Sequence, residues 1–375
     1  MSKLSSTNLV STFAQIAAEK KAVNLSNDHS DFPCQPELLD SLVKHISDGR
    51  NKYAPSEGVY ALRELIAKRY EKDFGISFNP ETEITITAGA IQAIYTAISS
   101  LIKEGDEVIV FEPAFETYVP AIEARGARPI FFQLNPPDFS VDWTAFTKLI
   151  TSKTKLIILN CPHNPTGKIM PDESLEHLQR ILNGTKISIL SDEAFADLIY
   201  DDRPTFSIAR YPKLAERSII VGSLGKALCV PGWKIGYCLA PEPVMDLIRQ
   251  VHKYLIYSVN LPIQLALADY LSGHQSWLPF RLEFQQRRDY FSSLLAKTRF
   301  TFDNVEGGYF QILNYKNIST ESDVDFCYRL ANEHGVSAYP LSLFYHDKID
   351  QSMIRVCFGK DEQDLNLAAK RLANL

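Results

Sequence analysis

The chain has 375 residues, of which 45% are hydrophobic and 22% are charged, as in an ordinary globular protein. This length suggests two domains, or one large domain with a smaller appendage. The formal net charge of −6 at pH 7 argues against a general surface for nucleic acid or anionic membranes. Because the chain has neither a signal-peptide core nor a run of about 18 apolar residues, we expect a soluble, cytoplasmic protein.

The cysteines are scattered along the chain and show neither a Cys-x-x-Cys pair nor zinc-ligand spacing. They are Cys34, Cys161, Cys229, Cys238, Cys327 and Cys357, and several lie in apolar runs. We therefore expect buried free thiols in a reducing compartment, and no metal site.

The N-terminal part of the chain predicts helices. The first is expected over residues 9–20, and the second begins at Pro36 and covers roughly a dozen residues. The third runs from Gly58 to Phe74, where Gly75 stops it. Residues 23–33 and 51–58 are expected to be irregular.

From Glu83 onward, short apolar runs alternate with helical spans. The expected strands cover residues 84–87, 108–111, 129–132, 156–160, 188–190, 219–221 and 235–239. Helical spans such as 143–149 and 173–182 lie between most of them. This alternation predicts an α/β fold with a mainly parallel, doubly wound sheet.

The C-terminal third predicts two long helical stretches and then a different architecture. The helical stretches cover residues 243–257 and 261 to about 297. After Phe300 the pattern becomes α+β, with strands at 309–313 and 353–357, a helix over 324–334 and a terminal helix. We expect a large domain over residues 36–285 and a smaller α+β domain formed by residues 1–35 with 286–375.

A lysine stands just past the apolar strand at residues 219–221. Ser223 lies three residues before Lys226, and Lys234 lies eight residues after it. Open α/β sheets place their chemistry at strand ends, and a Schiff-base lysine needs a pKa lowered by desolvation and a nearby cation. Ser223 and Lys234 would then hold a cofactor phosphate. Taken alone, the motif also fits a solvated loop lysine.

Two further strand ends carry residues suited to a flat, anionic ligand. Small residues at 88–90 open a helix, whose first N–H groups can bind an anion, although an ordinary tight turn is the alternative. Phe115 follows Pro113 by two residues and can stack on a flat ring, or it is plain core.

Two more strand ends carry polar groups. Two prolines bracket Asn164 and fix its loop, so its amide can donate to an oxygen; neighbouring His163 is a weaker candidate for a base. Asp192 ends an apolar strand, where a carboxylate needs a partner such as a protonated ring nitrogen. Metal binding by Asp192 and Glu193 is the rival interpretation. Together the strand ends point to a phosphorylated, planar heteroaromatic cofactor with a carbonyl, pyridoxal 5′-phosphate.

With these residues, the chain resembles the class I and II aminotransferases of the aspartate-aminotransferase fold. The shared motifs are Asn-Pro-Thr-Gly at 164–167, Ser-Asp-Glu at 191–193, Ser-x-x-Lys at 223–226 and Gly-Trp-Lys-x-Gly at 232–236. Within this family the chain is most similar to the methionine and kynurenine aminotransferase-like branch, on residues 53–58, 232–237 and 257–264. The resemblance implies the fold type I of pyridoxal-phosphate-dependent transferases.

The resemblance also implies residue roles. Lys226 is the Schiff-base lysine and the proton carrier, Asp192 pairs with the pyridinium nitrogen, and Asn164 donates to the ring oxygen O3′. Arg355 clamps the substrate carboxylate together with Asn164, and Asp28 lies at the substrate. The implied cofactor-binding set is Tyr53, Ala90, Ile91, Phe115, Asn164, Asp192, Ser223, Lys226 and Lys234, with Tyr53 reaching from the neighbouring subunit of a homodimer.

Three residues depart from the family pattern. Asp28 stands where the family usually has a glycine, and either narrows the substrate pocket, favours an amine-bearing substrate or points to solvent. Phe195 replaces the usual tyrosine that donates to O3′, and Lys234 replaces the commoner arginine. Leu267 stands near the position where dicarboxylate-specific relatives keep an arginine.

The resemblance implies an aminotransferase that moves the amino group of a neutral, largely apolar or aromatic amino acid to a 2-oxo acid. A carbon–sulfur β-lyase on the same scaffold is the alternative, because fold does not decide between them. A cofactor-sensing regulator would need a DNA-binding extension, and only about 20 residues precede Val23. We therefore expect small-molecule substrates and neither nucleic acid nor membrane as partner.

Overall fold

The computed structural model describes residues 9–274, 277 and 279–375. Its α-helices are α1 (Leu9–Lys20), α2 (Pro36–Ser47), α3 (Tyr60–Phe74), α4 (Gly89–Leu101), α5 (Tyr118–Glu123), α6 (Trp143–Thr147), α7 (Asp172–Leu182), α8 (Pro212–Ala215), α9 (Leu224–Ala227), α10 (Glu242–Leu255), α11 (Leu261–Gly273), α12 (Arg281–Leu295), α13 (Asp323–Glu333) and α14 (Glu362–Leu372). Its strands are β1 (Val23–Asn24), β2 (Ile84–Thr87), β3 (Glu107–Glu112), β4 (Arg128–Gln133), β5 (Thr154–Asn160), β6 (Ser188–Asp192), β7 (Ser218–Gly222), β8 (Gly236–Leu239), β9 (Phe310–Asn314), β10 (Val336–Ser337), β11 (Tyr339–Pro340) and β12 (Met353–Cys357).

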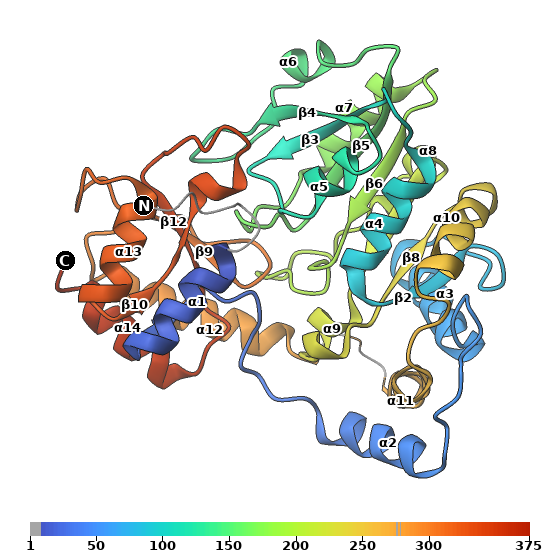
Figure 1. Ribbon diagram of the computed structural model, residues 1–375, viewed down its shortest axis with the longest axis horizontal. Coiled ribbons are helices and arrows are strands. Elements are labelled where there is room, and N and C mark those ends of the chain that lie inside the picture. Colours follow the sequence, from blue (N-terminus) through green and yellow to red (C-terminus); the bar gives the residue numbers. More distant parts are fainter. Residues whose placement is uncertain (1–8, 275–276, 278) are drawn as a thin grey trace.

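A seven-stranded sheet forms the centre of the larger lobe, with the order β2-β8-β7-β6-β5-β3-β4 (Figure 1). β8 runs antiparallel to its neighbours β2 and β7, and the remaining pairs are parallel. The inner strands are apolar because both faces of the sheet are covered: Val108 and Val110 belong to one buried cluster, Ile109 and Phe111 to the other. The predicted mainly parallel α/β sheet is confirmed.

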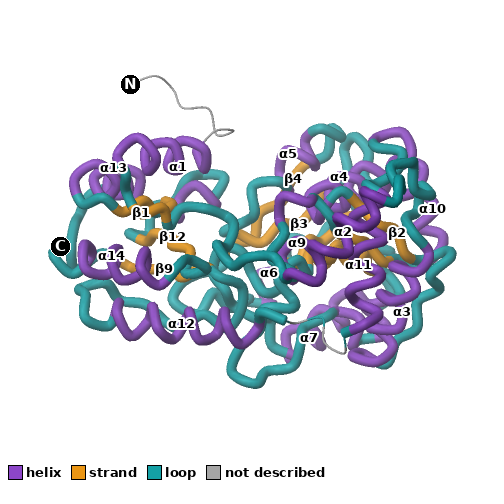
Figure 2. Tube along the Cα trace, turned by 90° about the horizontal axis from the view of Figure 1, so that it is seen from below, coloured by secondary structure: helices purple, strands orange, loops and turns teal. Residues whose placement is uncertain are grey.

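A smaller lobe lies beside this sheet, and it combines both ends of the chain (Figure 2). It holds the antiparallel sheet β11-β12-β9 and the pair β1-β10, covered by α1, α12, α13 and α14. Val23 of β1 pairs with Val336 of β10, so the N-terminal segment is anchored on the C-terminal part. From there residues 25–35 lead back to α2 of the larger lobe (Figure 1), and on the way the main-chain oxygen of Asp28 accepts a hydrogen bond from Lys226.

The structure corrects one predicted helix. The stretch from Leu261 to about residue 297 is two helices, because α11 ends at Gly273 and α12 begins only at Arg281. Pro279, just before α12, has no N–H for a continuous helix, and Gly273 is a poor helix former. α12 also spans residues 285 and 286, between which the domain boundary was expected; that boundary stays a prediction. None of the described helices is long and apolar enough to cross a membrane.

Candidate active site

A cavity of about 260 Å³ lies at the carboxyl ends of the parallel strands, between the two lobes. Nine of the predicted site residues line it: Asp28, Ala90, Ile91, Phe115, Asn164, Asp192, Ser223, Lys226 and Lys234. The pairing register explains why they meet. Asn160 pairs with Asp192 across β5 and β6, and Asp192 pairs with Val221 across β6 and β7, so these strands end at one edge. The structure thus brings together residues far apart in the sequence.

Lys226 lies in the short helix α9, directly after β7, and its amine points at the crossing N-terminal segment. Its Nζ donates to the main-chain oxygen of Asp28 and to the hydroxyl of Tyr309, at 2.6 Å each. Burial lowers the pKa of Lys226 to about 8, although the negative charge of Asp28 opposes the shift. A sizeable fraction of the amine is therefore neutral near neutral pH, as a nucleophile or base requires.

Asp192 is buried at the end of β6 and lines the same cavity. Its Oδ2 accepts from the Tyr118 hydroxyl at 2.6 Å, and its Oδ1 accepts from the Ala194 N–H at 3.1 Å. Burial raises the pKa of Asp192, and these hydrogen bonds and the charge of Lys226 oppose that rise. A cationic ring nitrogen in the cavity would be a natural partner for such a carboxylate.

The start of α4 forms an anion cradle. No side chain caps the helix at Ala88, so the first N–H groups face the cavity without a capping oxygen. Lys234 Nζ lies 3.7 Å from where a Cβ on Gly89 would stand, so a cation sits at the positive end of the helix dipole. Within the described part of the chain, no carboxylate forms an ion pair with Lys234. An anion bound here would satisfy both groups, with the Ser223 hydroxyl as a further donor.

Close packing shapes the same cradle. A Cβ added to Gly236 would stand 2.9 Å from the Ala90 nitrogen and 2.7 Å from the Gly222 oxygen. The absence of a side chain at this position lets β8 approach the first turn of α4. A larger residue at position 236 would push β8 away from the start of α4 and so distort the cradle.

Arg355 lies in β12, behind the cavity, and is only 1% exposed. Its guanidinium contacts the Asp28 carboxylate, donates to Asn164 Oδ1 at 3.0 Å, and lies 3.9 Å above the Phe310 ring. Asn164 is itself fixed, because its N–H donates to Asn160 Oδ1 at 2.7 Å. The predicted pair of Arg355 and Asn164 is therefore together in the structure, but Arg355 is not among the described residues that line the cavity.

Tyr53 does not lie in the cavity of its own chain. Its side chain is 84% exposed and meets the Tyr257 ring edge-on at 5.5 Å. Tyr254, Leu255 and Ile256, which directly precede Tyr257 in the sequence, are also exposed. Apolar surface of this kind is typical of an interface with another chain.

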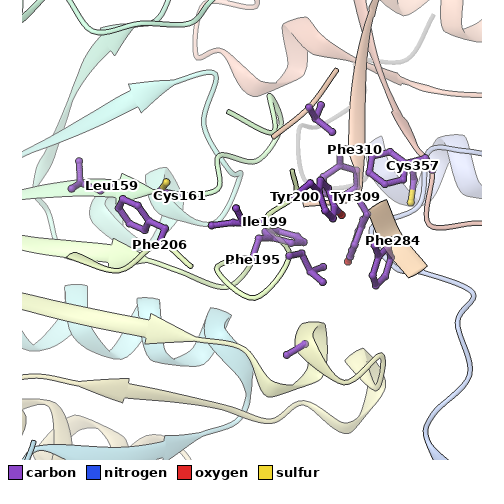
Figure 3. Close-up of a cluster of buried hydrophobic side chains, with 14 of the residues drawn as sticks. Leu159, Cys161, Phe195, Ile199, Tyr200, Phe206, Phe284, Tyr309, Phe310 and Cys357 are labelled. Carbon is purple, nitrogen blue, oxygen red and sulfur yellow. The ribbon is translucent and has the colours of Figure 1, made fainter. Parts of the chain in front are cut away.

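Several other sequence candidates are placed clearly. Phe195 does line the cavity, edge-on to the Tyr309 ring at 5.1 Å and close to Phe310 (Figure 3). His163 shares a hydrogen bond with Thr166 Oγ1 at 2.7 Å, and burial lowers the pKa of His163 to about 4. His163 does not line the cavity of Lys226. It lines a different cavity of about 460 Å³, and neither Asp192 nor Lys226 is among the lining residues of that cavity. Leu267 is fully buried in α11 and is not among the residues that line the smaller cavity.

The rival interpretation of a metal pair is not favoured by the geometry. Glu193 points away from Asp192, and its Oε1 accepts from Ser191 Oγ at 2.8 Å and from the Ile208 N–H at 2.9 Å. Burial raises the pKa of Glu193 to about 7. Its side chain is therefore part of the packing behind β6 rather than of the cavity wall.

Three site residues were not found from the sequence. Tyr118 holds Asp192, Tyr309 holds Lys226, and Glu116 lines the cavity beside Phe115. Tyr118 follows Phe115 by three residues, and this short spacing to a predicted site residue is the signal that could have found it. No local signal marks Tyr309, which comes from the other lobe.

Comparison with known proteins identifies the family. Residues 20–372 match the model for aminotransferase class I and II, and the chain belongs to this family. It is 40% identical to the methionine aminotransferase of Escherichia coli K12 over 370 residues, covering 98% of this chain and 96% of that protein. It is 31% identical to the kynurenine–oxoglutarate transaminase of Dictyostelium discoideum, over 97% of this chain and 93% of that one.

The solved structures agree. An Escherichia coli crystal structure with a methionine aminotransferase function matches with a TM-score of 0.96 at 39% identity, covering 100% of both chains. The N-succinyldiaminopimelate aminotransferase of Mycobacterium tuberculosis matches with a TM-score of 0.94 at 29% identity, again over 100% of both chains. These relatives are aminotransferases and give no support to the β-lyase alternative.

The protein is therefore an aminotransferase, and pyridoxal phosphate is its cofactor. The residues present fit this group. The anion cradle at α4 suits its phosphate, Asp192 suits its ring nitrogen, and the desolvated amine of Lys226 suits its carbonyl. All three lie on the walls of one cavity.

Proposed function

We propose that this aminotransferase takes the amino group from neutral, largely apolar or aromatic amino acids, resembling methionine and phenylalanine, and passes it to a 2-oxo acid. The observation that carries this proposal is the large apolar share of the cavity lining, which includes Ile91, Phe115, Phe195 and Phe310. The cations that line the cavity are Lys226 and Lys234, and both are assigned to the cofactor, whereas Asp28 and Glu116 are acidic. A second carboxylate on the donor would therefore lack a cationic partner and would cost several kcal/mol.

We propose the cofactor-binding roles for residues that line the cavity. Ser223, Lys234 and the Ala90 and Ile91 N–H groups would hold the phosphate, and Phe115 would stack on the ring. Asp192, held by Tyr118, would keep a proton on the ring nitrogen. This arrangement is supported by the uncapped start of α4 and by the position of Lys234 Nζ beside Gly89, where no carboxylate of the described residues pairs with it.

Lys226 is proposed as the residue that attaches the cofactor and then moves the proton at the substrate α-carbon. Pyridoxal phosphate, when bound, supplies an electron sink for the bonds of that carbon. The lowered pKa lets the Lys226 amine accept a proton near neutral pH and give it back. The Tyr309 hydroxyl, 2.6 Å from Nζ, holds the amine in place between these events.

Arg355 and Asn164 are proposed to bind the substrate carboxylate. The rigid guanidinium fork can form two parallel hydrogen bonds with a carboxylate, which fixes the α-carbon as well as the charge. The support is the position of Arg355, packed on Phe310 and bonded to Asn164 at the edge of the cavity.

We further propose a homodimer in which Tyr53 of one subunit reaches the phosphate of the other. The exposed Tyr53, Tyr254 and Tyr257 support it, and sedimentation of the holoenzyme tests it directly. A cytoplasmic location is proposed because all six cysteines are free thiols, five of them buried. We also propose two domains, one over residues 36–285 and one formed by residues 1–35 with 286–375. The reason is the change of sequence pattern from alternating strands and helices to α+β after Phe300.

An amino-donor panel with one fixed 2-oxo acid tests the proposed substrate class. Methionine and phenylalanine should give higher kcat/KM than aspartate and glutamate by a factor of about 100 or more, from an unpaired carboxylate costing several kcal/mol. If aspartate outruns both neutral donors, the proposed class is wrong. Release of pyruvate and ammonia without any 2-oxo acid would instead indicate a lyase.

A further inference from the structure

The arginine that should hold the substrate carboxylate already contacts a carboxylate of the protein itself. Arg355 and Asp28 form an ion pair between residues 327 positions apart in the chain. The Asp28 side chain is 36% exposed and lines the cavity, whereas the Arg355 side chain is 1% exposed and does not. Seen from the cavity, Asp28 therefore covers Arg355.

The two partners differ in how firmly they are held. The Arg355 guanidinium is fixed by Asn164 Oδ1 at 3.0 Å, by the Ser26 main-chain oxygen at 3.5 Å and by the Phe310 ring. Its Nε is buried without a hydrogen-bond partner among the described residues. Among the described residues, Arg355 alone forms a hydrogen bond with the Asp28 carboxylate, which lines the cavity. Any exchange at this pair would therefore move Asp28 and leave Arg355 in place.

The main chain at residue 28 stays anchored while the side chain is free to turn. Its carbonyl oxygen accepts from the Tyr309 hydroxyl at 2.7 Å, a hydrogen bond that does not depend on the Lys226 amine. Three residues further along the segment, Asp31 is held by Lys360, whose Nζ lies 2.7 Å from Asp31 Oδ1. A rotation about the Asp28 side-chain bonds is thus enough to uncover Arg355.

A displaced Asp28 would still lie close to the incoming substrate. Glu116 lines the same cavity, and partial burial together with the charge of Asp28 raises the pKa of Glu116, while Arg355 lowers it. The substrate carboxylate would enter the cavity beside the side chains of Asp28 and Glu116, and their negative charges would repel it. The substrate must therefore overcome both the existing ion pair and this repulsion.

Resting on the proposed carboxylate role of Arg355, we propose that Asp28 is a specificity-determining residue. It occupies Arg355 in place of the substrate α-carboxylate, and every amino acid or 2-oxo acid binds by displacing it. Ligands of the same shape without a carboxylate leave the Asp28–Arg355 pair intact and do not meet this competition. Asp28 thereby lowers the preference of the pocket for carboxylate-bearing ligands over uncharged ones.

Binding of two unreactive probes to the holoenzyme tests this competition. The probes are 3-phenylpropanoate and 3-phenylpropanamide, which share their shape and differ in the carboxylate. Asp28→Asn and Asp28→Ala should tighten the Kd of the carboxylate by about 10- to 100-fold, the range for one charged hydrogen bond. The Kd of the amide should stay within about threefold. An unchanged carboxylate Kd in both variants overturns the proposal.

Glu116→Gln is the matched control, because it removes an acid from the same cavity without uncovering Arg355. It should tighten carboxylate binding by no more than about threefold, through charge alone. If Glu116→Gln and Asp28→Asn tighten binding equally, the general charge of the cavity is responsible and direct competition is refuted.

Thermal unfolding gives a second readout. Asp28→Ala leaves a buried guanidinium without its counter-ion, so its Tm should fall below that of the wild type. Saturating 3-phenylpropanoate should then raise the Tm of Asp28→Ala more than that of the wild type, because it restores the pair. An equal or smaller rise contradicts the proposal. Neither measurement requires turnover. The role of Asp28 can therefore be confirmed even if the amino-donor panel contradicts the proposed substrate class. Equally, the substrate class can be confirmed when the role of Asp28 is refuted.

Discussion

The two ends of the active-site cavity are built in different ways. At the cofactor end, Asp192, Ser223, Lys226 and Lys234 lie at strand ends of one sheet, within residues 84–239. At the substrate end, Asp28, Tyr309 and Arg355 come from the N-terminal segment and from the sheet of the smaller lobe. The cofactor end is thus fixed by one rigid layer, and the substrate end by two lobes that meet.

This difference separates chemistry from specificity. A parallel sheet places its strand ends at one edge whatever the loops contain, so the groups for the cofactor are positioned by the fold. The substrate end depends on a crossing segment held by a few contacts, such as those of Asp28 with Lys226 and Arg355. Replacement of one residue there changes which ligands bind without disturbing the sheet.

The largest effect is expected at the cofactor end, from Lys226→Ala. Loss of the amine removes both the covalent attachment and the proton carrier, so kcat should fall by a factor of about 10⁴ or more. Steady-state kinetics give kcat, and borohydride reduction followed by mass spectrometry shows whether the cofactor is still attached. Lys148→Ala, at an exposed lysine of the larger lobe, is the control and should keep both properties. Retained turnover with an attached cofactor would remove Lys226 from this role.

At the substrate end, Arg355→Lys should lower kcat/KM for all amino-acid donors by a similar factor. A lysine keeps the charge but loses the fork that pairs with a carboxylate, at a cost of about 1.5–3 kcal/mol, or roughly 10- to 100-fold. Kinetics with methionine, phenylalanine and leucine measure it. Arg128→Lys, at an exposed arginine that pairs with Glu107 far from the cavity lining, is the control and should change kcat/KM little. A loss confined to one donor would place Arg355 at the side chain of the substrate instead of its carboxylate.

The same division decided what the sequence alone could predict. β2, β5 and β7 were placed within two residues, because short runs rich in isoleucine, leucine and valine mark a strand buried on both faces. The motif residues that follow these strands were then correctly expected to meet. β1, β10 and β11 were missed, since two residues carry no periodicity.

Contacts between the lobes were beyond the sequence for a different reason. The Asp28–Arg355 pair joins residues 327 positions apart, and nothing local in either segment encodes the distance between them. The substitution of Asp28 for the usual glycine was visible, but not whether its side chain faced solvent or Arg355. Tyr309 was invisible for the same reason, although it contacts Lys226.

The pH dependence of cofactor attachment tests the lowered pKa of Lys226. Only the neutral amine can attack a carbonyl, and burial lowers the pKa of Lys226 to about 8. Since a lowered pKa makes the amine neutral at lower pH, the attachment rate in the apoenzyme should rise as pH passes through about 8 and then level off. An exposed lysine would show its midpoint near about 10.4. Borohydride trapping at timed intervals measures the rate, and a midpoint above about 10 would show that Lys226 is solvated before the cofactor binds.

The smallest expected effect tests Phe195, where this chain departs from the family pattern inside the cofactor end. Phe195 lines the cavity and meets Tyr309 edge-on, so a hydroxyl added in Phe195→Tyr has the cavity beside it. With the cofactor bound, such a hydroxyl would donate to its ring oxygen, stabilise negative charge there and weaken that oxygen's hold on the proton shared with Lys226. One hydrogen bond to a charged acceptor is worth about 1.5–3 kcal/mol, or about one to two pH units. The visible absorbance of Phe195→Tyr should therefore change at a pH about one to two units below that of the wild type. Phe115→Tyr adds a hydroxyl to another wall of the same cavity, and its midpoint should stay in place. An unchanged or raised midpoint in Phe195→Tyr would mean that another donor already serves the ring oxygen.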